Sequence, residues 1–223
     1  YKRQSLDGIW LYRLEVLGIY IFLLLFLYYL KTRRFRNLVV CFSCLLCLGI
    51  YHTVMRWYDR PCPSLVFYNV RGCPAIHCIA EDGTSWLNYA DTLSDKRRLQ
   101  AVAANYWRRH QLLPPIEVTA DCQNVDFCRH QQIVFYHGCR ICMVTDNRWR
   151  NKSAASPLFI NYMYLCKGYN GRLEELTGLF SPSCILLDAS LSDDRKQFFR
   201  EECKRLHLHF ITLSEEGSVR FLL

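Results

Sequence analysis

Two long apolar runs near the start of the chain dominate its pattern of hydrophobic and polar positions. The first covers residues 9–30 and the second residues 37–55, and the second carries no formal charge. A helix needs about 20 mostly apolar residues to cross the hydrocarbon core of a bilayer. Buried core helices are the alternative, but such helices are seldom apolar on every face. The pattern therefore predicts two transmembrane helices, with Arg13 and Glu15 of the first reaching toward the headgroups.

The segment between the two runs predicts how they are oriented. It holds four cations within six residues, which are Lys31, Arg33, Arg34 and Arg36. Short loops rich in Lys and Arg stay on the cytoplasmic side of a membrane. Basic residues at the outer ends of the helices oppose this signal but are less concentrated. We expect a multi-pass protein of the cytoplasmic (inner) membrane, with the C-terminal domain on the external or periplasmic side.

The rest of the chain alternates between short strand patterns and helix patterns. This alternation predicts a layered α/β domain. Ser94 and Ser192 are expected to cap helices, and residues 209–213 and 219–222 are expected to form a closing hairpin. The predicted strands are 65–70, 75–80, 85–89, 116–120, 133–136, 140–145, 158–166 and 184–187, and the predicted helices are 94–111, 171–180 and 193–207. The predicted organisation is two helices within residues 1–58, a linker at 59–63 and a domain at 64–223.

Charge and cysteine content narrow the function classes. The net charge is +8, of which residues 1–55 contribute +5 and residues 56–223 contribute +3. The excess therefore lies in the membrane region, where it can meet anionic lipid. By charge alone, the domain is not a strongly basic nucleic-acid binder. The thirteen cysteines are too scattered to define a disulfide framework, although some could pair outside the cytoplasm.

Two short motifs carry candidate chemistry, and both favour a structural reading. Cys139 and Cys142 form a C-x-x-C inside a strand pattern, whereas a redox pair would open a helix. A zinc site would need a second ligand pair, and Cys122 and Cys128 have poor spacing for one. The H-x-H at residues 207–209 falls at a helix end. The basic helix at 94–111 is most simply a solvated face, and we expect Asp188 to cap a turn.

Several segments follow the motif order of a known family. Residues 68–72 stand where that family has D-V-G-Q-G-D, residues 81–83 match its P-D-G turn, and residues 86–91 follow where it has L-I-D-x-G. Thr145-Asp146 stands at the end of its T-G-D strand, and a helix, Ser181-Pro182 and an apolar strand come later. In this order the chain resembles the C-terminal end of the ComEC-type competence proteins, in which a polytopic channel carries a metallo-β-lactamase-like domain.

The departures from that family are as informative as the matches. Its hallmark H-x-H-x-D-H cluster supplies metal ligands, but residues 116–122 read IEVTADC here. Its H-H-G site reads Cys166-Lys167-Gly168. A hydrolytic zinc site needs several His or carboxylate ligands, and Asp146 is the main survivor. The resemblance implies two transmembrane helices followed by an α/β domain with a degenerate metallo-β-lactamase fold, without catalytic residues, metal or cofactor.

The resemblance also implies a role in transport. We expect the C-terminal part of a larger channel that takes single-stranded DNA across the cytoplasmic membrane during transformation, with a domain that guides DNA or braces the channel. Its partners would be the lipid bilayer, single-stranded DNA and other competence proteins. Two alternatives remain open: a hydrolase or nuclease with a rearranged metal site, and a membrane-anchored interaction module unrelated to DNA. The candidate DNA contacts are Arg148, Trp149, Arg150, Lys152 and Lys167, beside the former active site.

Overall fold

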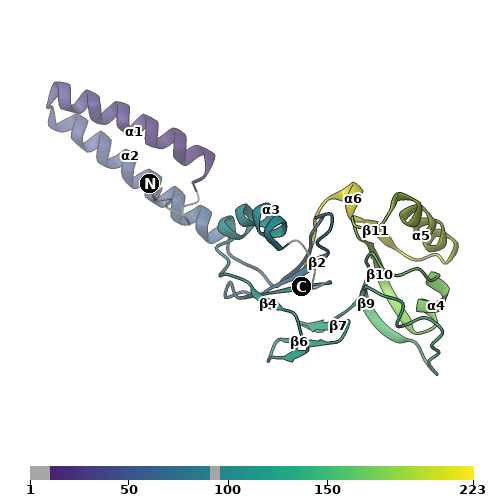
Figure 1. Ribbon diagram of the computed structural model, residues 1–223. Coiled ribbons are helices and arrows are strands. Elements are labelled where there is room, and N and C mark those ends of the chain that lie inside the picture. The colour runs from purple at the N-terminus through teal and green to yellow at the C-terminus, as the bar shows by residue number, and fades with distance from the viewer. Residues whose placement is uncertain (1–10, 91–95) are drawn as a thin grey trace, which may run out of the picture. The chain divides into compact units, whose positions relative to one another are not determined.

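A computed structural model describes residues 11–90 and 96–223 (Figure 1). The chain divides into two compact units, Tyr1–Arg60 with Tyr106–Gln111, and Pro61–Asn105 with Leu112–Leu223. The two apolar helices belong to the first unit and the sheets to the second. Two predicted features, the Ser94 helix cap and Asp91 of the family motif, lie outside the described residues.

The two apolar runs fold as a helical hairpin. Helix α1 spans Arg13–Thr32 and α2 spans Phe35–Tyr58, and they run side by side (Figure 1). At 1.5 Å per residue these helices are about 30 Å and 36 Å long. Both are long and apolar enough to cross a membrane. The two predicted helices are therefore present, with bounds that differ by a few residues from 9–30 and 37–55.

The connection between α1 and α2 is shorter than the predicted basic loop. Helix α1 continues through Lys31 and ends at Thr32, because Arg33 takes a left-handed backbone conformation with a φ of 48°. Helix α2 begins at Phe35, so Arg36 lies in its first turn. The four cations still cluster at one end of the hairpin. The side of the membrane on which they lie remains a prediction.

Polar groups near the other end of the hairpin bind one another. The Glu15 carboxylate is 4% exposed and lies 2.7 Å from His52 Nδ1, and the Tyr12 amide donates to it at 2.9 Å. The Tyr12 hydroxyl donates to Asp59 at 2.8 Å. The expectation that Glu15 reaches toward the headgroups is therefore wrong, because a buried carboxylate needs a partner and α2 supplies one. Arg13 is exposed, as expected.

The second unit contains two mixed sheets. The five-stranded sheet has the order β12-β1-β2-β3-β4 and the seven-stranded sheet the order β11-β10-β9-β8-β7-β6-β5. The strands of the first are β1 (Ser64–Phe67), β2 (Ala75–Ile79), β3 (Ser85–Tyr89), β4 (Ile116–Val118) and β12 (Val219–Leu222). Those of the second are β5 (Cys122–Gln123), β6 (Phe127–His130), β7 (Ile133–Tyr136), β8 (Cys139–Val144), β9 (Leu158–Leu165), β10 (Phe180–Leu187) and β11 (Phe210–Thr212).

Parallel pairing is concentrated where the larger sheet carries its helices. Strands β8, β9, β10 and β11 pair in parallel, and β3 pairs in parallel with β4. The remaining pairs are antiparallel, including the β2–β3 hairpin at residues 80–84 and the β7–β8 hairpin. His137 and Gly138 turn the second hairpin with φ values of 45° and 76°, as a two-residue turn of this kind requires. The strands that these two hairpins join were predicted at 75–80, 85–89, 133–136 and 140–145, and all four are present.

One hydrophobic core lies between the two sheets. It combines Leu65 and Ile76 of the five-stranded sheet with Tyr136, Ile141 and Tyr164 of the seven-stranded sheet, all at 1% exposure or less. The ring of Trp86 stacks on that of Phe127 at a centroid distance of 5.5 Å. Because side chains alternate along a strand, the opposite faces of both sheets are left for helices to cover.

Helices cover those opposite faces. Helices α4 (Leu173–Thr177) and α5 (Asp193–Arg205) pack on the seven-stranded sheet, where Leu173, Leu176 and Phe199 are fully buried (Figure 1). On the other sheet, Lys96 of α3 (Lys96–Arg109) lies 4.9 Å from the Tyr89 ring and pairs with Glu117. Helix, sheet, sheet and helix thus form successive layers, which confirms the predicted layered α/β class.

The predicted closing hairpin is wrong. Strand β11 pairs in parallel with β10 in the seven-stranded sheet, whereas β12 pairs antiparallel with β1 in the five-stranded sheet. A four-residue helix, α6 (Leu213–Glu216), and Gly217 with a φ of 84° carry the chain from one sheet to the other. Two apolar strands around a glycine turn look alike in sequence whether they pair with each other or with distant strands.

Other element bounds also differ from prediction. Strand β10 begins at Phe180, which was predicted to end the helix at 171–180, so the strand predicted at 184–187 is longer and α4 is shorter than expected. Strands β5 and β6 were not predicted. Helix α5 matches its prediction closely, and the predicted cap is confirmed, since the Ser192 hydroxyl oxygen accepts from the Arg195 amide.

Candidate functional site

Ends of several strands from both sheets surround one hollow, which we call the strand-end pocket. Parallel strands of one sheet end at the same edge, where loops can build a site. Ala90 follows β3, Thr145 and Asp146 follow β8, Cys166 and Lys167 follow β9, and Ser190 follows β10; all line a cavity of about 380 Å³. The family resemblance pointed to this edge through Asp146 and the Cys166-Lys167-Gly168 segment.

Asp146 forms the rim of this pocket together with Arg148. Arg148 Nε donates to both carboxylate oxygens at 3.0 Å, and its Nη2 lies 2.8 Å from Oδ2. Burial alone would raise the pKa of Asp146, but the hydrogen bonds and positive charge of Arg148 outweigh it, so the pKa is lowered. The carboxylate to which the family resemblance drew attention is therefore ionised and already paired with a cation.

Lys167 adds an exposed positive charge to the same pocket. Among residues 11–90 and 96–223, its ammonium group has no hydrogen-bond or ion-pair partner. Its position is set by Gly168, which has a φ of 118° and packs directly against the backbone of Thr145. A Cβ at residue 168 would lie 2.2 Å from the Thr145 carbonyl oxygen. Only glycine lets the chain leave β9 this close to the end of β8.

A buried polar network forms the wall behind the pocket. The Tyr164 hydroxyl donates to Asp188 Oδ1, and the Ser190 amide donates to Asp188 Oδ2 at 2.7 Å. The predicted turn-capping role of Asp188 is thus confirmed. Burial raises the pKa of Asp188, although its hydrogen bonds oppose that change. Burial also raises the pKa of the Cys166 thiol well above its ordinary value, so this thiol does not offer a ready anionic ligand.

A second hollow adjoins the strand-end pocket, sharing Ala90 and Thr145 with it. Arg148 and Arg129 both line this cavity of about 220 Å³. Arg129 Nη1 donates to the Val118 carbonyl oxygen at 2.7 Å, and burial lowers its pKa from the ordinary value. The strand ends thus present the guanidinium groups of Arg129 and Arg148 near Lys167, and the Asp121 carboxylate lines the same cavity as the two arginines.

The predicted DNA contacts divide into two groups. Arg148 and Lys167 line the two adjoining pockets. Trp149 instead anchors the loop, since its indole N–H donates to Gln132 Oε1 at 2.6 Å and its ring packs edge-on against Phe180. The remaining two residues of the group, Arg150 and Lys152, line no hollow described above. Arg150 lies 3.6 Å from Glu175, and Lys152 lies 5.3 Å from the Trp149 ring.

Gln132 is a positioning residue that sequence reasoning missed. Its side chain is 5% exposed, accepts from Trp149 and donates to the Thr145 hydroxyl at 2.6 Å. It therefore ties the basic loop to the pocket rim. A polar residue directly before the strand at 133–136 was the available signal, but nothing local distinguished it from an ordinary loop glutamine.

The other candidate motifs do not assemble a reactive site. Cys139 and Cys142 lie in β8 three positions apart and so face opposite sides of the sheet. All thirteen cysteines are free. His209 Nδ1 lies 3.2 Å from Cys184 Sγ, but burial raises the pKa of Cys184 to about 11. Within the described part of the chain, no group of three His, Cys, Asp or Glu residues could hold a metal ion.

Comparisons with known proteins give one match. A family model described as the ComEC C-terminal domain matches residues 65–223, which is more than half of the chain. No curated protein and no solved structure matches the chain. The match covers nearly all of the sheet unit and follows directly after the two apolar helices.

Proposed function

Since this chain belongs to the ComEC C-terminal domain family, we propose that it is part of a DNA-uptake membrane protein whose sheet unit contacts single-stranded DNA without cleaving it. The family and the two apolar helices together fit a membrane protein of competence. We propose in addition that the substrate is single-stranded DNA, that the sheet unit has no catalytic role, and that it lies on the external side of the membrane. It also treats the two-sheet arrangement as a degenerate metallo-β-lactamase fold.

The observation that carries the proposal is the charge of the strand-end pocket. Positions at which the family resemblance expects metal ligands hold the buried Cys166 thiol and the exposed Lys167 ammonium group. Asp146 is neutralised by Arg148. With Asp146 paired to Arg148, Lys167 is the charge of the lining that has no described partner, and its ammonium group repels a divalent metal ion and attracts a phosphodiester. The residues present here therefore do not fit the family's metal ion, and no reaction step is assigned to one.

The adjoining hollow extends this charge along the strand ends. Arg129 and Arg148 line it beside one carboxylate, Asp121, so a strand of DNA that entered at Lys167 would next meet two guanidinium groups. Backbone contacts of this kind neutralise phosphates without reading bases, which suits a domain that must accept any sequence. Guiding single-stranded DNA is the function that this arrangement serves best.

Binding of single-stranded DNA to the full 223-residue chain in zwitterionic nanodiscs tests the proposal. We expect weak binding at low salt, with the logarithm of affinity falling by about 0.7 per neutralised phosphate for each tenfold rise in salt. Metal analysis of the same sample should show less than one ion per chain, and the oligonucleotide should remain intact.

Two outcomes would contradict the proposal and identify which alternative replaces it. Cleavage of the oligonucleotide with one or two metal ions per chain would support a hydrolase with a rearranged site. No binding at low salt would support a membrane-anchored interaction module. A charge-reversed variant, K167E with R148E, serves as the control, because it should lose binding while it retains the fold.

A further inference from the structure

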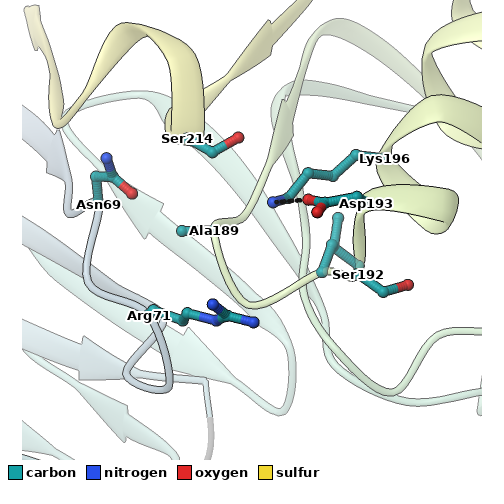
Figure 2. A pocket seen from close by; sticks show the side chains of 8 residues that line it. Asn69, Arg71, Ala189, Ser192, Asp193, Lys196 and Ser214 are labelled. Carbon is teal, nitrogen blue, oxygen red and sulfur yellow. Dashed lines mark hydrogen bonds and ion pairs between the residues drawn. The ribbon is translucent and has the colours of Figure 1, made fainter.

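A third hollow, which we call the α5 pocket, adjoins the strand-end pocket. Its lining includes Arg71 and Ala189, the chain neighbours of Gly72 and Ser190 in the strand-end pocket. The cavity measures about 370 Å³. Figure 2 shows that Arg71 and Lys196 extend into it from two different elements, the loop after β1 and helix α5. Nothing in the proposed function so far accounts for it.

Lys196 is the unusual residue of this pocket. It is only 9% exposed, and its one hydrogen-bond partner is Asp193 Oδ1 at 3.2 Å. The Asp193 side chain is 99% exposed, and an ion pair with so exposed a partner compensates little of the cost of burial. An ammonium group has three N–H donors. Two of them have no partner within the described residues and are available to an anion in the cavity.

Arg71 supplies a second cation from across the cavity. Its side chain points into the hollow (Figure 2), and no described residue pairs with its guanidinium group. Arg98 donates to its backbone carbonyl oxygen at 3.5 Å, so the main chain beneath the side chain is held. The hydroxyl oxygen of Ser192 accepts from the Arg195 amide, which leaves the hydroxyl proton free to donate. Asn69 and Ser214 add further donors to the lining.

We infer that the α5 pocket binds a phosphate group between Arg71 and Lys196. A phosphate has several oxygens, so it can accept both from the planar fork of an arginine and from the point charge of a lysine. The N-terminus of α5 faces the same space, but Asp193 and Asp194 stand there as well, and the two cations carry the argument. The source of the phosphate rests on the proposed function, since single-stranded DNA carries one phosphodiester per nucleotide.

The test compares R71Q and K196Q with matched controls that remove the same charges elsewhere. K204Q changes another lysine of α5, and R172Q changes another exposed arginine. Each full-length variant in zwitterionic nanodiscs is titrated with a fluorescent 20-nucleotide DNA, and inorganic phosphate is titrated as a competitor. Loss of a charge-assisted phosphate contact should weaken binding about tenfold in R71Q and K196Q. The two controls should change it less than about twofold.

Two forms of the oligonucleotide distinguish the source of the phosphate. Equal binding of DNA with a 5′-hydroxyl and a 5′-phosphate end supports an internal phosphodiester as the ligand, and a preference for the 5′-phosphate supports capture of a strand end. Because Arg71 is exposed, R71Q should fold normally. It therefore keeps the inference testable if K196Q unfolds, and a thermal melt of each variant checks this.

Failure of the inference and failure of the proposed function give different results. If the wild-type chain binds DNA and R71Q and K196Q bind it equally well, the α5 pocket is not a phosphate site, while DNA contact at Lys167 stands. If the wild-type chain binds no DNA but binds inorganic phosphate in an Arg71-dependent way, the pocket stands and the proposed function fails. If neither ligand binds at millimolar concentration, the inference is overturned.

Discussion

The rim and the wall of the strand-end pocket each hold an aspartate that follows a parallel strand, and the two behave in opposite ways. Asp146 on the rim is partly exposed and paired with Arg148, which lowers its pKa. Asp188 in the wall is buried against Tyr164, and burial raises its pKa. The charge of one carboxylate is paired with a cation, whereas burial disfavours the charged form of the other. The comparison shows that two aspartates at the same edge of one sheet can have pKa values shifted in opposite directions by a paired cation and by burial.

The largest effect on stability should come from adding a side chain at residue 168, where the backbone packs closely against Thr145. In G168A, a new Cβ would lie 2.2 Å from the Thr145 carbonyl oxygen at a residue with a φ of 118°. We expect the free energy of unfolding to fall by about 3 kcal/mol or more. G217A is the matched control, because its φ is 84° but nothing lies within 4 Å, and it should lose about 1–2 kcal/mol. Equal losses in thermal or denaturant melts would contradict the close approach.

A smaller effect on stability is expected from removing one hydrogen bond of the buried polar network in the pocket wall. Y164F removes the hydroxyl that donates to the buried Asp188, so one carboxylate oxygen loses its hydrogen bond. The free energy of unfolding should fall by about 1–3 kcal/mol. Y162F, which changes the same side chain two residues away in β9, should have a smaller effect in the same denaturant melt. A Y164F variant as stable as Y162F would show that the network contributes nothing.

The pH dependence of stability should separate the two aspartates by sign. Asp188 has a folded pKa above its ordinary 3.8, so its contribution to stability is full below pH 3.8 and is lost as the pH rises through the folded value. Asp146 has a folded pKa below 3.8, so its contribution is present above pH 3.8 and is lost as the pH falls through the folded value. Melting temperatures of D188N and D146N between pH 2.5 and 7 should differ from wild type in opposite pH windows. The same window for both would contradict the comparison.

The smallest effect should be the loss of one rim charge from DNA binding. K167Q removes an exposed ammonium group without a described partner, so it should leave the melting temperature unchanged. The slope of log affinity against log salt should become shallower by about 0.7. K204Q, which lies outside the pocket, is the control for nonspecific charge loss. An unchanged slope in K167Q would show that Lys167 neutralises no DNA phosphate.

Sequence patterns predicted elements whose partners are near in the chain. The hairpin turned by His137 and Gly138, the Ser192 cap and the two apolar helices all depend on local sequence, and all are present. Strands β5 and β6 were missed, because residues 122–130 contain few apolar residues and are stabilised by pairing with each other and with β7. The closing hairpin was wrong because the partner of β12 is β1, at the other end of the domain.

The residues of the site also fall into those whose positions the sequence could predict and those whose positions it could not. Asp146 and Lys167 could be placed at one edge, because both directly follow strands with a recognisable order. Arg71 and Lys196 could not be placed together, since they meet only after the loop following β1 and helix α5 have been brought side by side by the two sheets. The burial of Lys196 could not be predicted either, because its place in the sequence resembles that of an exposed lysine on a helix surface.

The pairing of β1 with β12 has a consequence for synthesis of the protein. Strand β1 is the first strand of the sheet unit and is translated before the others, whereas β12 comprises residues 219–222. Until that segment leaves the ribosome, one edge of β1 has no native partner and stays open to other strands. Ribosome-bound chains halted before residue 219 should therefore be far more sensitive to protease than chains in which residues 219–222 have left the ribosome. The five-stranded sheet therefore stays incomplete until nearly all residues of the sheet unit have been translated.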